Sequence, residues 1–365
     1  MKAFVHEQLP GRVVFGAGTF ARLAEEVDRL GVTRVLLISD AAAKATSDEA
    51  AEALRERVAA RISEVRQHVP AEEAARVGAT AREAGVDGLV TIGGGSATGL
   101  AKAVALELPV VIIAVPTTYA GSEVTPIYGI TRESSKQTGR DVRVLPRTVI
   151  YDPALTVALP ADVTASSGLN ALAHCVEALY DGDPSPIVQL MAEEAIRALA
   201  RGIPASVRHP DDLDARGDAL YGAFLAGAVL AVSRMALHHT ISHVLGGTYG
   251  LTHGPINAAL LPHVARFNAP AAPDAMRRVA GALGAGDAPG GIYDLAATVG
   301  APTSLAAIGM DESKLAEAAH LSIQSLKWNP RPVGEDDVLA VLRDAYAGIR
   351  PVAPPPAGDL RYGAR

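Results

Sequence analysis

The stretch GLVTIGGGSATGLAKAVALELPVVIIAVPTTYAGSEVT, residues 88–125, determines the fold that the sequence predicts. It contains two apolar runs, at 88–92 and 109–115, which are separated by a glycine-rich turn and an Ala- and Leu-rich stretch. Continuous apolar runs of this length are typical of strands that are buried on both faces of a parallel sheet. We therefore expect a strand, a tight turn, a helix and a second strand, followed by a loop rich in hydroxyl groups.

The residues before this stretch continue the alternation of strands and helices. We expect strands at 12–16, 34–40 and 65–70, and helices at 19–30, 47–60 and 72–84. After it, the runs 127–131 and 142–149 flank a polar loop and predict a hairpin at the sheet edge. Apolar strands that alternate with helices indicate an α/β domain whose parallel sheet is covered by helices on both faces.

The chain from Pro160 onward has almost purely helical periodicity. The expected helices are 161–181, 184–202, 210–233, 237–247, 254–267, 271–284, 288–299, 302–306, 311–320 and 335–348. The loss of strands places a domain boundary close to the end of the α/β part. We expect an α/β dinucleotide-binding domain at 1–156, an all-α substrate domain at 157–350 and a Pro-rich tail at 351–365.

Composition excludes several classes of function. The chain has 365 residues, of which 49% are hydrophobic, and a formal net charge of −7 at pH 7. An acidic chain is a poor partner for nucleic acid or an anionic membrane surface, and no apolar run is long enough to cross a bilayer. The single cysteine, Cys175, excludes an internal disulfide and is typical of a reducing compartment, so we expect a cytoplasmic protein. Its apolar surroundings favour a small buried side chain over a reactive thiol.

Four features of the N-terminal part are candidates for binding a dinucleotide. The turn Gly93–Ser96 offers close backbone approach and free N–H groups at a helix start, which favour a phosphate, with a simple tight turn as the alternative. Asp40 ends an earlier strand, where its carboxylate accepts hydrogen bonds from a ribose 2′-hydroxyl or else caps a helix. The hydroxyl groups of the loop Pro116–Ser122 are expected to hold the nicotinamide ribose and the second phosphate. Lys136 is either a further cofactor contact or a solvated lysine.

Polar side chains interrupt the apolar helices of the C-terminal part at regular intervals. Asn170 and His174 are four residues apart, and His239 and His243 repeat this spacing. Residues four apart share one face of a helix. His253 follows a glycine-rich turn and precedes Gly-Pro, which is typical of a helix start. Since buried polar groups need partners or a function, we expect one amide and four imidazoles to meet in one cleft.

The motifs GGGS, PTTYAGSE, YDP, HxxxHxLG, THG and LPHVARFN occur in this order along the chain. Together they resemble the iron-containing, or group III, alcohol dehydrogenase family, which has a dehydroquinate synthase-like fold. The resemblance implies an N-terminal dinucleotide-binding domain, a helical C-terminal domain, an active site in the cleft between them and assembly as a homodimer. It also implies that the pyrophosphate is held by Gly94, Gly95 and Ser96, and that the cofactor loop contributes Thr117, Thr118 and Ser122.

One position departs from the metal-dependent members that this sequence resembles. Those members hold the metal with an Asp and three His, and the matching positions here are Asn170, His174, His239 and His253. Three neutral imidazoles without a carboxylate offset the charge of a divalent ion poorly, so we expect no bound metal. The amide also resembles the maleylacetate reductase branch of the family, which reduces maleylacetate to 3-oxoadipate with NADH or NADPH. This resemblance implies a small dicarboxylate substrate, and Asp40 favours NADH over NADPH.

Reduction of such an enone requires donors for an enolate oxygen, groups that attract two carboxylates and a source of one proton. We assign His243 as the proton donor, and His174, His239, His253 and Asn170 as substrate anchors. The alternative within the family is a metal-dependent dehydrogenase acting on a small alcohol or aldehyde. A cofactor-binding protein without catalysis and a zinc hydrolase are weaker alternatives, because the cleft residues are intact and no HExxH motif occurs.

Overall fold

The computed structural model describes residues 4, 6, 9, 11–66, 69–132, 135–182 and 184–353, without the side chains of residues 135 and 136. One sheet contains β1 (Arg12–Phe15), β2 (Val35–Ser39), β3 (Val58–Ile62), β4 (Gly88–Gly93), β5 (Val111–Pro116) and β8 (Thr148–Tyr151). A separate hairpin contains β6 (Ile127–Arg132) and β7 (Ser135–Arg140). The helices among these strands are α1 (Leu23–Arg29), α2 (Lys44–Leu54), α3 (Ala71–Glu83) and α4 (Gly95–Glu107). The later helices are α5 (Ala161–Leu179), α6 (Pro186–Arg208), α7 (Leu213–Leu230), α8 (Leu237–Tyr249), α9 (His253–Asn268), α10 (Pro273–Leu283), α11 (Ala288–Thr298), α12 (Leu315–Ser325) and α13 (Glu335–Ala347).

The main sheet is parallel throughout and has the strand order β1-β8-β5-β4-β2-β3. The chain leaves β2 through α2 and reaches β3 at one edge, whereas it leaves β4 through α4 and reaches β5 on the other side. The connections that leave the neighbouring strands β2 and β4 therefore turn in opposite directions. Ligands of open parallel sheets bind in the crevice at such a point, outside the carboxyl ends of the strands.

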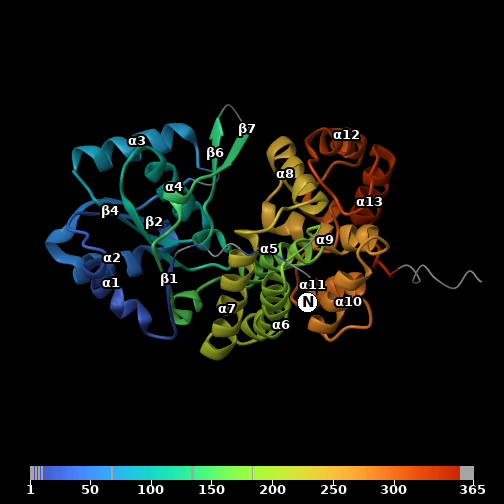
Figure 1. Ribbon diagram of the computed structural model, residues 1–365, viewed down its shortest axis with the longest axis horizontal. Helices are drawn as coiled ribbons and strands as arrows, with labels where there is room; N and C mark the ends of the chain where they lie inside the picture. Colours follow the sequence, from blue (N-terminus) through green and yellow to red (C-terminus); the bar gives the residue numbers. More distant parts are fainter. Residues whose placement is uncertain are drawn as a thin grey trace, which may run out of the picture.

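Both faces of the sheet are covered by helices, as Figure 1 shows for α3 on one side and α1 on the other. Alternate residues of a strand point to opposite faces. In β2, Leu36 and Ile38 belong to an apolar cluster with residues of α3 and α4, and Val35 and Leu37 belong to another with residues of α1 and α2. The predicted α/β fold class, with a parallel sheet between two helical layers, is confirmed.

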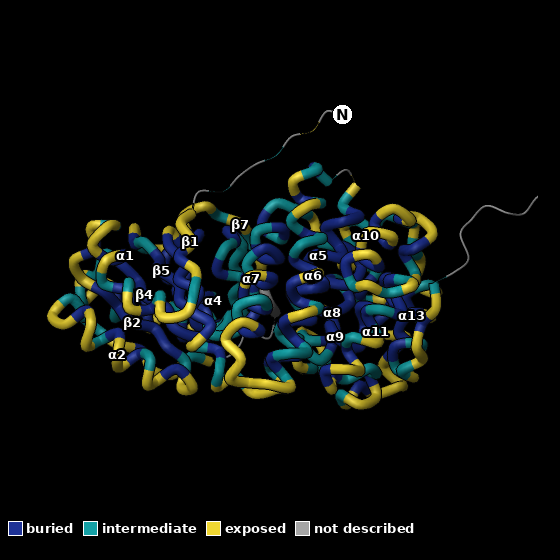
Figure 2. Tube along the Cα trace, turned by 90° about the horizontal axis from the view of Figure 1, so that it is seen from below, coloured by how far each residue is buried: buried dark blue, intermediate teal, exposed yellow. Residues whose placement is uncertain are grey.

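The C-terminal helices enclose two further apolar clusters. One lies around α5, α6 and α7, where Leu169 and Leu172 are fully buried, and the other lies among α8, α9, α12 and α13. Helix α5 is buried on nearly all sides, and Figure 2 shows it within the buried interior of the helical part. The predicted all-α part is confirmed. The change from strands to helices falls between β8 and α5, while the limit at residue 156 stays a prediction.

The predicted hairpin is wrong in its second strand. Strand β6 pairs with β7, whose sequence SKQTGR lies in the predicted loop, because a polar strand cannot be told from a loop by hydrophobic pattern. Residues Val142–Val144 form a short 3₁₀ helix instead. Residues Thr148–Tyr151 form β8, which pairs with β1 and β5 in the main sheet. This long-range pairing leaves no trace in the local sequence.

Two other predicted elements are also wrong. Strand β3 is Val58–Ile62, where a helix was expected to end, and residues 65 and 66 are not in a strand. Arg55 has a φ of 52° and follows the last residue of α2, after which the Ala-rich segment pairs with β2 at the sheet edge. Tertiary pairing therefore overrides helix propensity. Residues 302–304 are not helical, and a short 3₁₀ helix follows at Ala306–Ile308.

The loop that follows β5 is fixed against the helical part. Gly121 has a φ of 76°, and a Cβ added to it would lie 3.1 Å from the Cα of Gly227 in α7. Arg216, also in α7 and almost fully buried, donates hydrogen bonds to the Tyr119 hydroxyl (3.2 Å) and to Thr164 Oγ1 (2.9 Å). These contacts join the cofactor loop to α7 and α5.

Some expectations concern residues beyond those described. Of the predicted Pro-rich tail, residues 354–365 lie outside the described part of the chain. None of the helices in the described ranges is both long and apolar enough to span a bilayer.

Candidate active site

The glycine-rich turn and the loop after β5 lie side by side. Gly94 is the N-cap of α4, which begins at Gly95, and the first turn of α4 contains no acidic residue, so its free N–H groups favour an anion. The Thr117 N–H donates to the Gly93 carbonyl (3.0 Å). A Cβ added to Gly94 would lie 3.1 Å from the Thr118 methyl group, so even an alanine there would crowd the space beside the turn. The structure thus brings the two predicted cofactor segments together, and they suit a pyrophosphate.

Asp40 lies at the end of β2, beside the same turn. Its Oδ1 accepts a hydrogen bond from the Ala43 N–H (3.0 Å), and its Oδ2 accepts one from the Gly94 N–H (3.1 Å). The helix-cap alternative is therefore confirmed. Each carboxylate oxygen has more than one acceptor position, so the carboxylate can also accept from a ribose. That second role stays a prediction.

A buried lysine that our sequence reasoning missed supports the cofactor loop. Lys102 of α4 is fully buried, and its Nζ donates to the carbonyl oxygens of Ser122 (2.6 Å), Thr125 (2.8 Å) and Ile127 (2.8 Å). Burial lowers the pKa of Lys102 to about 7. A lysine inside an apolar helix was the signal in the sequence. The predicted residue Ser122 lies against Lys102, whereas the side chain of Lys136 is outside the described part.

Three helices each contribute two polar side chains that are four residues apart. The pairs are Asn170 and His174 on α5, His239 and His243 on α8, and His253 and Asn257 on α9. The imidazole centroids of His174 and His239 are 5.1 Å apart, those of His239 and His243 6.3 Å, and those of His243 and His253 5.6 Å. The Asn257 Nδ2 donates to Asn170 Oδ1 (2.6 Å), which links α9 back to α5. We call these six side chains the polar ring.

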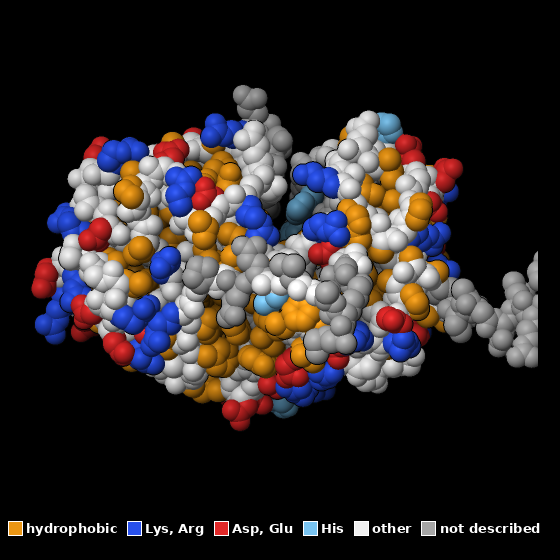
Figure 3. All heavy atoms as spheres, in the orientation of Figure 1, with side chains coloured by type: hydrophobic (Ala, Val, Ile, Leu, Met, Phe, Trp, Pro, Cys, Tyr) orange, Lys and Arg blue, Asp and Glu red, His pale blue; other side chains and the backbone are white. Residues whose placement is uncertain are grey.

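The members of the polar ring differ in their exposure to solvent. His174 and His239 are buried, Asn170 and His253 are half-buried, and His243 is exposed. Figure 3 shows a hollow between the sheet part and the helical part, with histidine in its wall and Lys or Arg side chains on its rim. The five predicted side chains of this ring are therefore brought together, and Asn257 is the member that sequence reasoning missed.

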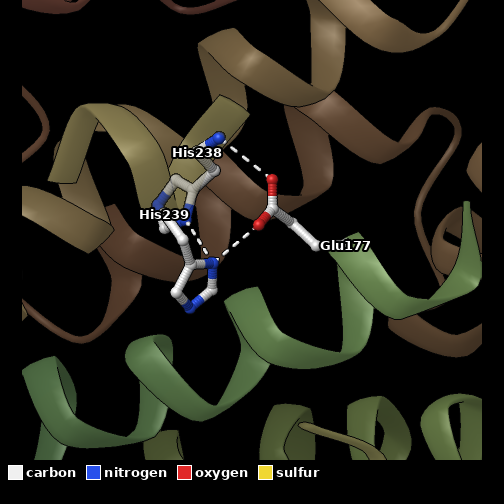
Figure 4. A group of neighbouring side chains, drawn as sticks. All are labelled: Glu177, His238 and His239. Atoms are coloured by element: carbon white, nitrogen blue, oxygen red, sulfur yellow. Dashed lines mark hydrogen bonds and ion pairs between the residues drawn. The ribbon is translucent and has the colours of Figure 1, made fainter. Parts of the chain in front are cut away.

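Glu177 lies behind the polar ring and was also missed. It is fully buried on α5, three residues after His174, and this helical spacing was the signal that could have found it. It accepts hydrogen bonds from His239 Nδ1 (2.7 Å) and from the N–H groups of Ala236 and His238 (2.9 Å each), as Figure 4 shows in part. Burial alone would raise its pKa, but these donors lower the pKa of Glu177 to about 2. Because Nδ1 of His239 faces Glu177, Nε2 of the same imidazole points away from Glu177.

Burial sets the charge of the neighbouring groups. Burial and the surrounding imidazoles lower the pKa of His174 well below its ordinary value of 6.5, so this side chain is neutral at pH 7. Burial likewise lowers the pKa of His238 to about 3 and that of His263 to about 4. It raises the pKa of the Cys175 thiol, in keeping with the expected inert, fully buried side chain.

Models of protein families match the chain in two consecutive segments. Residues 10–153 match "Iron-containing alcohol dehydrogenase", and residues 164–346 match "Fe-containing alcohol dehydrogenase family, C-terminal". The chain belongs to the iron-containing alcohol dehydrogenase family. Members of this family are NAD(P)-dependent oxidoreductases, which agrees with the arrangement of the glycine-rich turn and the cofactor loop.

Individual relatives within the family are similar over nearly their whole length. The chain is 47% identical over 349 residues to a maleylacetate reductase of Sphingobium indicum, which covers 96% of this chain and 99% of the relative. It is 48% identical over 351 residues to a maleylacetate reductase of Burkholderia cepacia, covering 96% and 100%. The crystal structure of maleylacetate reductase from Agrobacterium tumefaciens matches with a TM-score of 0.93 and 43% identity, over 96% of this chain and 100% of that chain. The predicted resemblance is confirmed.

The family name implies a metal, but the side chains present do not fit one. A candidate metal group consists of His, Cys, Asp and Glu side chains whose ligand atoms lie within 4.8 Å of one another. Among the described residues, Glu177, His238 and His239 form such a group. The oxygens of Glu177 are already occupied by N–H donors. His174, His239 and His253 do not form such a group, and the Asn170 oxygen accepts from an amide. A divalent ion would lack a converging set of ligands.

Replacement of the buried carboxylate should destabilise the fold in a pH-dependent way. The folded-state pKa of Glu177, about 2, is below its ordinary value of 4.5, so its stabilising contribution is complete above pH 4.5 and is lost as pH falls toward 2. We expect Glu177→Gln to lower the free energy of unfolding by about 3 kcal/mol at pH 7, and by progressively less below pH 4.5. Urea denaturation at pH 7, 5 and 3.5 measures this difference.

A matched control is Glu25→Gln, which removes an exposed carboxylate paired with Arg22. Its free energy of unfolding should stay close to that of the unmodified protein at each pH. A Glu177→Gln variant with the same stability as the control would show that the buried hydrogen bonds do not depend on the negative charge.

Proposed function

We propose that this chain is a maleylacetate reductase that acts without a bound metal and reduces the carbon–carbon double bond of maleylacetate to give 3-oxoadipate. Relatives of that name match it over nearly their full length. The structural observation that carries the proposal is the polar ring, in which Asn257 bonds to the Asn170 amide. The family resemblance implies that metal-dependent members have a carboxylate at the position of Asn170. A ring of imidazoles and amides attracts a dianion that a carboxylate would repel.

The reaction sets clear demands on the site. Maleylacetate is an enone with a carboxylate at each end. Addition of hydride to the carbon β to the ketone moves the electron pair of the double bond toward the ketone oxygen and gives an enolate. A proton then bonds to the carbon α to the ketone, which completes the reduction. The chain must therefore bind two carboxylates, stabilise the enolate oxygen and deliver one proton.

The N-terminal part would hold the cofactor, a reduced nicotinamide dinucleotide, which supplies the hydride when bound. The residues that we assign to it are Asp40, Gly94, Gly95, Ser96, Thr117, Thr118, Ser122 and Lys136. The open N–H groups of α4 suit the pyrophosphate, and the threonine hydroxyl groups beside them suit a ribose. We propose NADH as the donor, because the Asp40 carboxylate beside the turn would repel the 2′-phosphate of NADPH.

The buried members of the polar ring act as anchors in this proposal. His174 is neutral at pH 7 and so offers a hydrogen bond without a charge. Glu177 accepts from Nδ1 of His239 and so orients the ring, and Nε2, which has no partner within the described residues, donates to a substrate oxygen in the imidazolium form of this pair. Asn170 and His253 complete the set. Fixed donors of this kind stabilise an enolate oxygen because they need no rearrangement during the reaction.

We propose His243 as the proton donor because it is the exposed member of the polar ring and can regain a proton from water. The His243→Ala variant should lose roughly 10²–10⁴-fold in kcat, as is typical when a general acid is removed, with little change in the KM for NADH. The control is His320→Ala, an exposed histidine on α12 that pairs with Glu335 and should keep full turnover. Nearly full turnover of His243→Ala would assign the proton to another group.

The first test of the proposed function is the oxidation of NADH with maleylacetate, using enzyme that has been treated with a strong chelator and checked by elemental analysis. We expect full turnover without metal, because the polar ring supplies all the donors that the reaction needs. Turnover that disappears on chelation and returns with iron or zinc would contradict the metal-free reaction. Activity with a small alcohol or aldehyde but none with maleylacetate would favour the metal-dependent dehydrogenase.

We further propose that the chain forms a homodimer through the edge of the sheet at β1. Val13 and Phe15 of this edge strand are 36% and 40% exposed, and Phe15 contacts Tyr221 of α7 edge-on (6.4 Å between ring centroids). An exposed apolar edge strand is a natural pairing surface. Sedimentation equilibrium should give twice the mass of the chain, and a monomer mass at micromolar concentration would contradict the dimer.

A further inference from the structure

Asn257 is a buried amide with only half of its hydrogen-bonding capacity in use. It lies on α9, one turn after His253, and is fully buried. Its Nδ2 donates to Asn170 Oδ1 (2.6 Å), whereas its own Oδ1 is buried without a partner in the described part of the chain. An unpaired buried oxygen costs stability, so a purely structural role explains this side chain poorly.

The contact between α5 and α9 holds the two amides in register. Gly254 of α9 approaches Ser166 of α5 so closely that an added Cβ would lie 2.8 Å from the Ser166 Cβ. Asn257 is three residues after Gly254, and Asn170 is four residues after Ser166, so the amide pair lies about one helical turn further along both helices. This packing fixes the position of Asn257 before any substrate binds.

The hydrogen bond determines which atom Asn170 presents to the hollow. A side-chain amide has one oxygen acceptor and one NH₂ donor. Because Asn257 occupies the oxygen of Asn170, the Asn170 NH₂ group remains, and it makes no other hydrogen bond within the described residues. We infer that Asn257 is a positioning residue that turns the Asn170 amide so that its nitrogen faces the substrate. This assignment rests on the proposed function, because it takes a dicarboxylate as the ligand.

The orientation has a consequence for specificity. With its nitrogen toward the hollow, Asn170 donates a hydrogen bond to a carboxylate or enolate oxygen of the substrate. With its oxygen toward the hollow, the same side chain would repel those oxygens. Position 170 therefore selects for anions only while Asn257 holds it. Glu177 acts on His239 in a comparable way, since it occupies Nδ1 and leaves Nε2 for the ring.

A double-mutant cycle tests this inference on the full-length enzyme. We expect Asn257→Leu, which keeps the branched shape of the side chain but has no donor, to raise the KM for maleylacetate by about 10-fold or more, and to leave the KM for NADH within about two-fold. Asn170→Ala should raise the KM for maleylacetate to a similar extent. The double variant should be no worse than Asn170→Ala, because Asn257 acts through Asn170. An unchanged KM in Asn257→Leu, or equal effects of Asn257→Leu with and without Asn170, would overturn the inference.

The matched control is Asn268→Leu, on the same helix. Asn268 is also fully buried and also bonds to a second asparagine, Asn329, through its Nδ2 (3.0 Å). The Asn268→Leu variant should be less stable than the unmodified enzyme but keep the KM for maleylacetate within about two-fold. This result would separate a positioning role from general destabilisation. If Asn257→Leu does not fold, Asn257→Ser takes its place in the cycle, because serine is too short to reach Asn170.

The same cycle also separates this inference from the proposed function. An unmodified enzyme that does not turn over maleylacetate would contradict the proposed function. The cycle is then measured by calorimetry as the Kd of 3-oxoadipate for the enzyme saturated with NAD⁺. A 10-fold weaker Kd in Asn257→Leu that disappears in the Asn170→Ala background supports the positioning role, and additive effects or no effect contradict it.

Discussion

Glu177 joins two parts of the chain that are far apart in sequence, α5 and the start of α8. Its carboxylate lies on α5, accepts the N–H groups at the start of α8 and holds His239 by its Nδ1. A buried carboxylate is tolerated only when donors surround it, and here those donors come from the segment that carries His239 and His243 of the polar ring. The position of α8 against α5, and with it the geometry of the polar ring, follows from the need to satisfy this one charge.

The polar ring can likewise surround a negatively charged substrate with hydrogen-bond donors. Its side chains carry no negative charge, while the neighbouring carboxylate of Glu177 accepts hydrogen bonds from His239 Nδ1 and the Ala236 N–H. In a metal-dependent relative, a carboxylate at position 170 would compensate the charge of the ion. In the reaction that we propose, the site without that carboxylate attracts an anion directly, and the protein supplies the stabilising dipoles. In this proposal, one amide at position 170 changes which charge the hollow accepts.

Periodicity and composition were sufficient to predict the parallel sheet, the helical part and several residues of the site. The apolar runs predicted the parallel sheet, and the four-residue spacings predicted that Asn170, His174, His239 and His243 would share a site. What the sequence did not reveal depends on pairing between distant segments. Strand β7 is polar and β3 is Ala-rich, so neither has a strand pattern of its own, and β8 exists through its neighbours β1 and β5.

The missed site residues have a similar explanation. Glu177, Asn257 and Lys102 are single polar residues in apolar helices, and their roles depend on the atoms that face them in other elements. Spacing indicates which side chains share a helix face, but it does not indicate which atom of an amide or imidazole is already occupied. Which atom is occupied depends on the tertiary structure, and it determines which atoms of the polar ring remain to bind a ligand.

The close contact of Gly121 with Gly227 bears on how the site can move. Lys102 ties α4 to the segment that follows the loop after β5, and the glycine contact and Arg216 tie that loop to α7. A hinge between this loop and α7 would have to break the buried hydrogen bond from Arg216 to Tyr119 and separate the two glycines. The loop and α7 are therefore joined by the fold itself, before any ligand is bound.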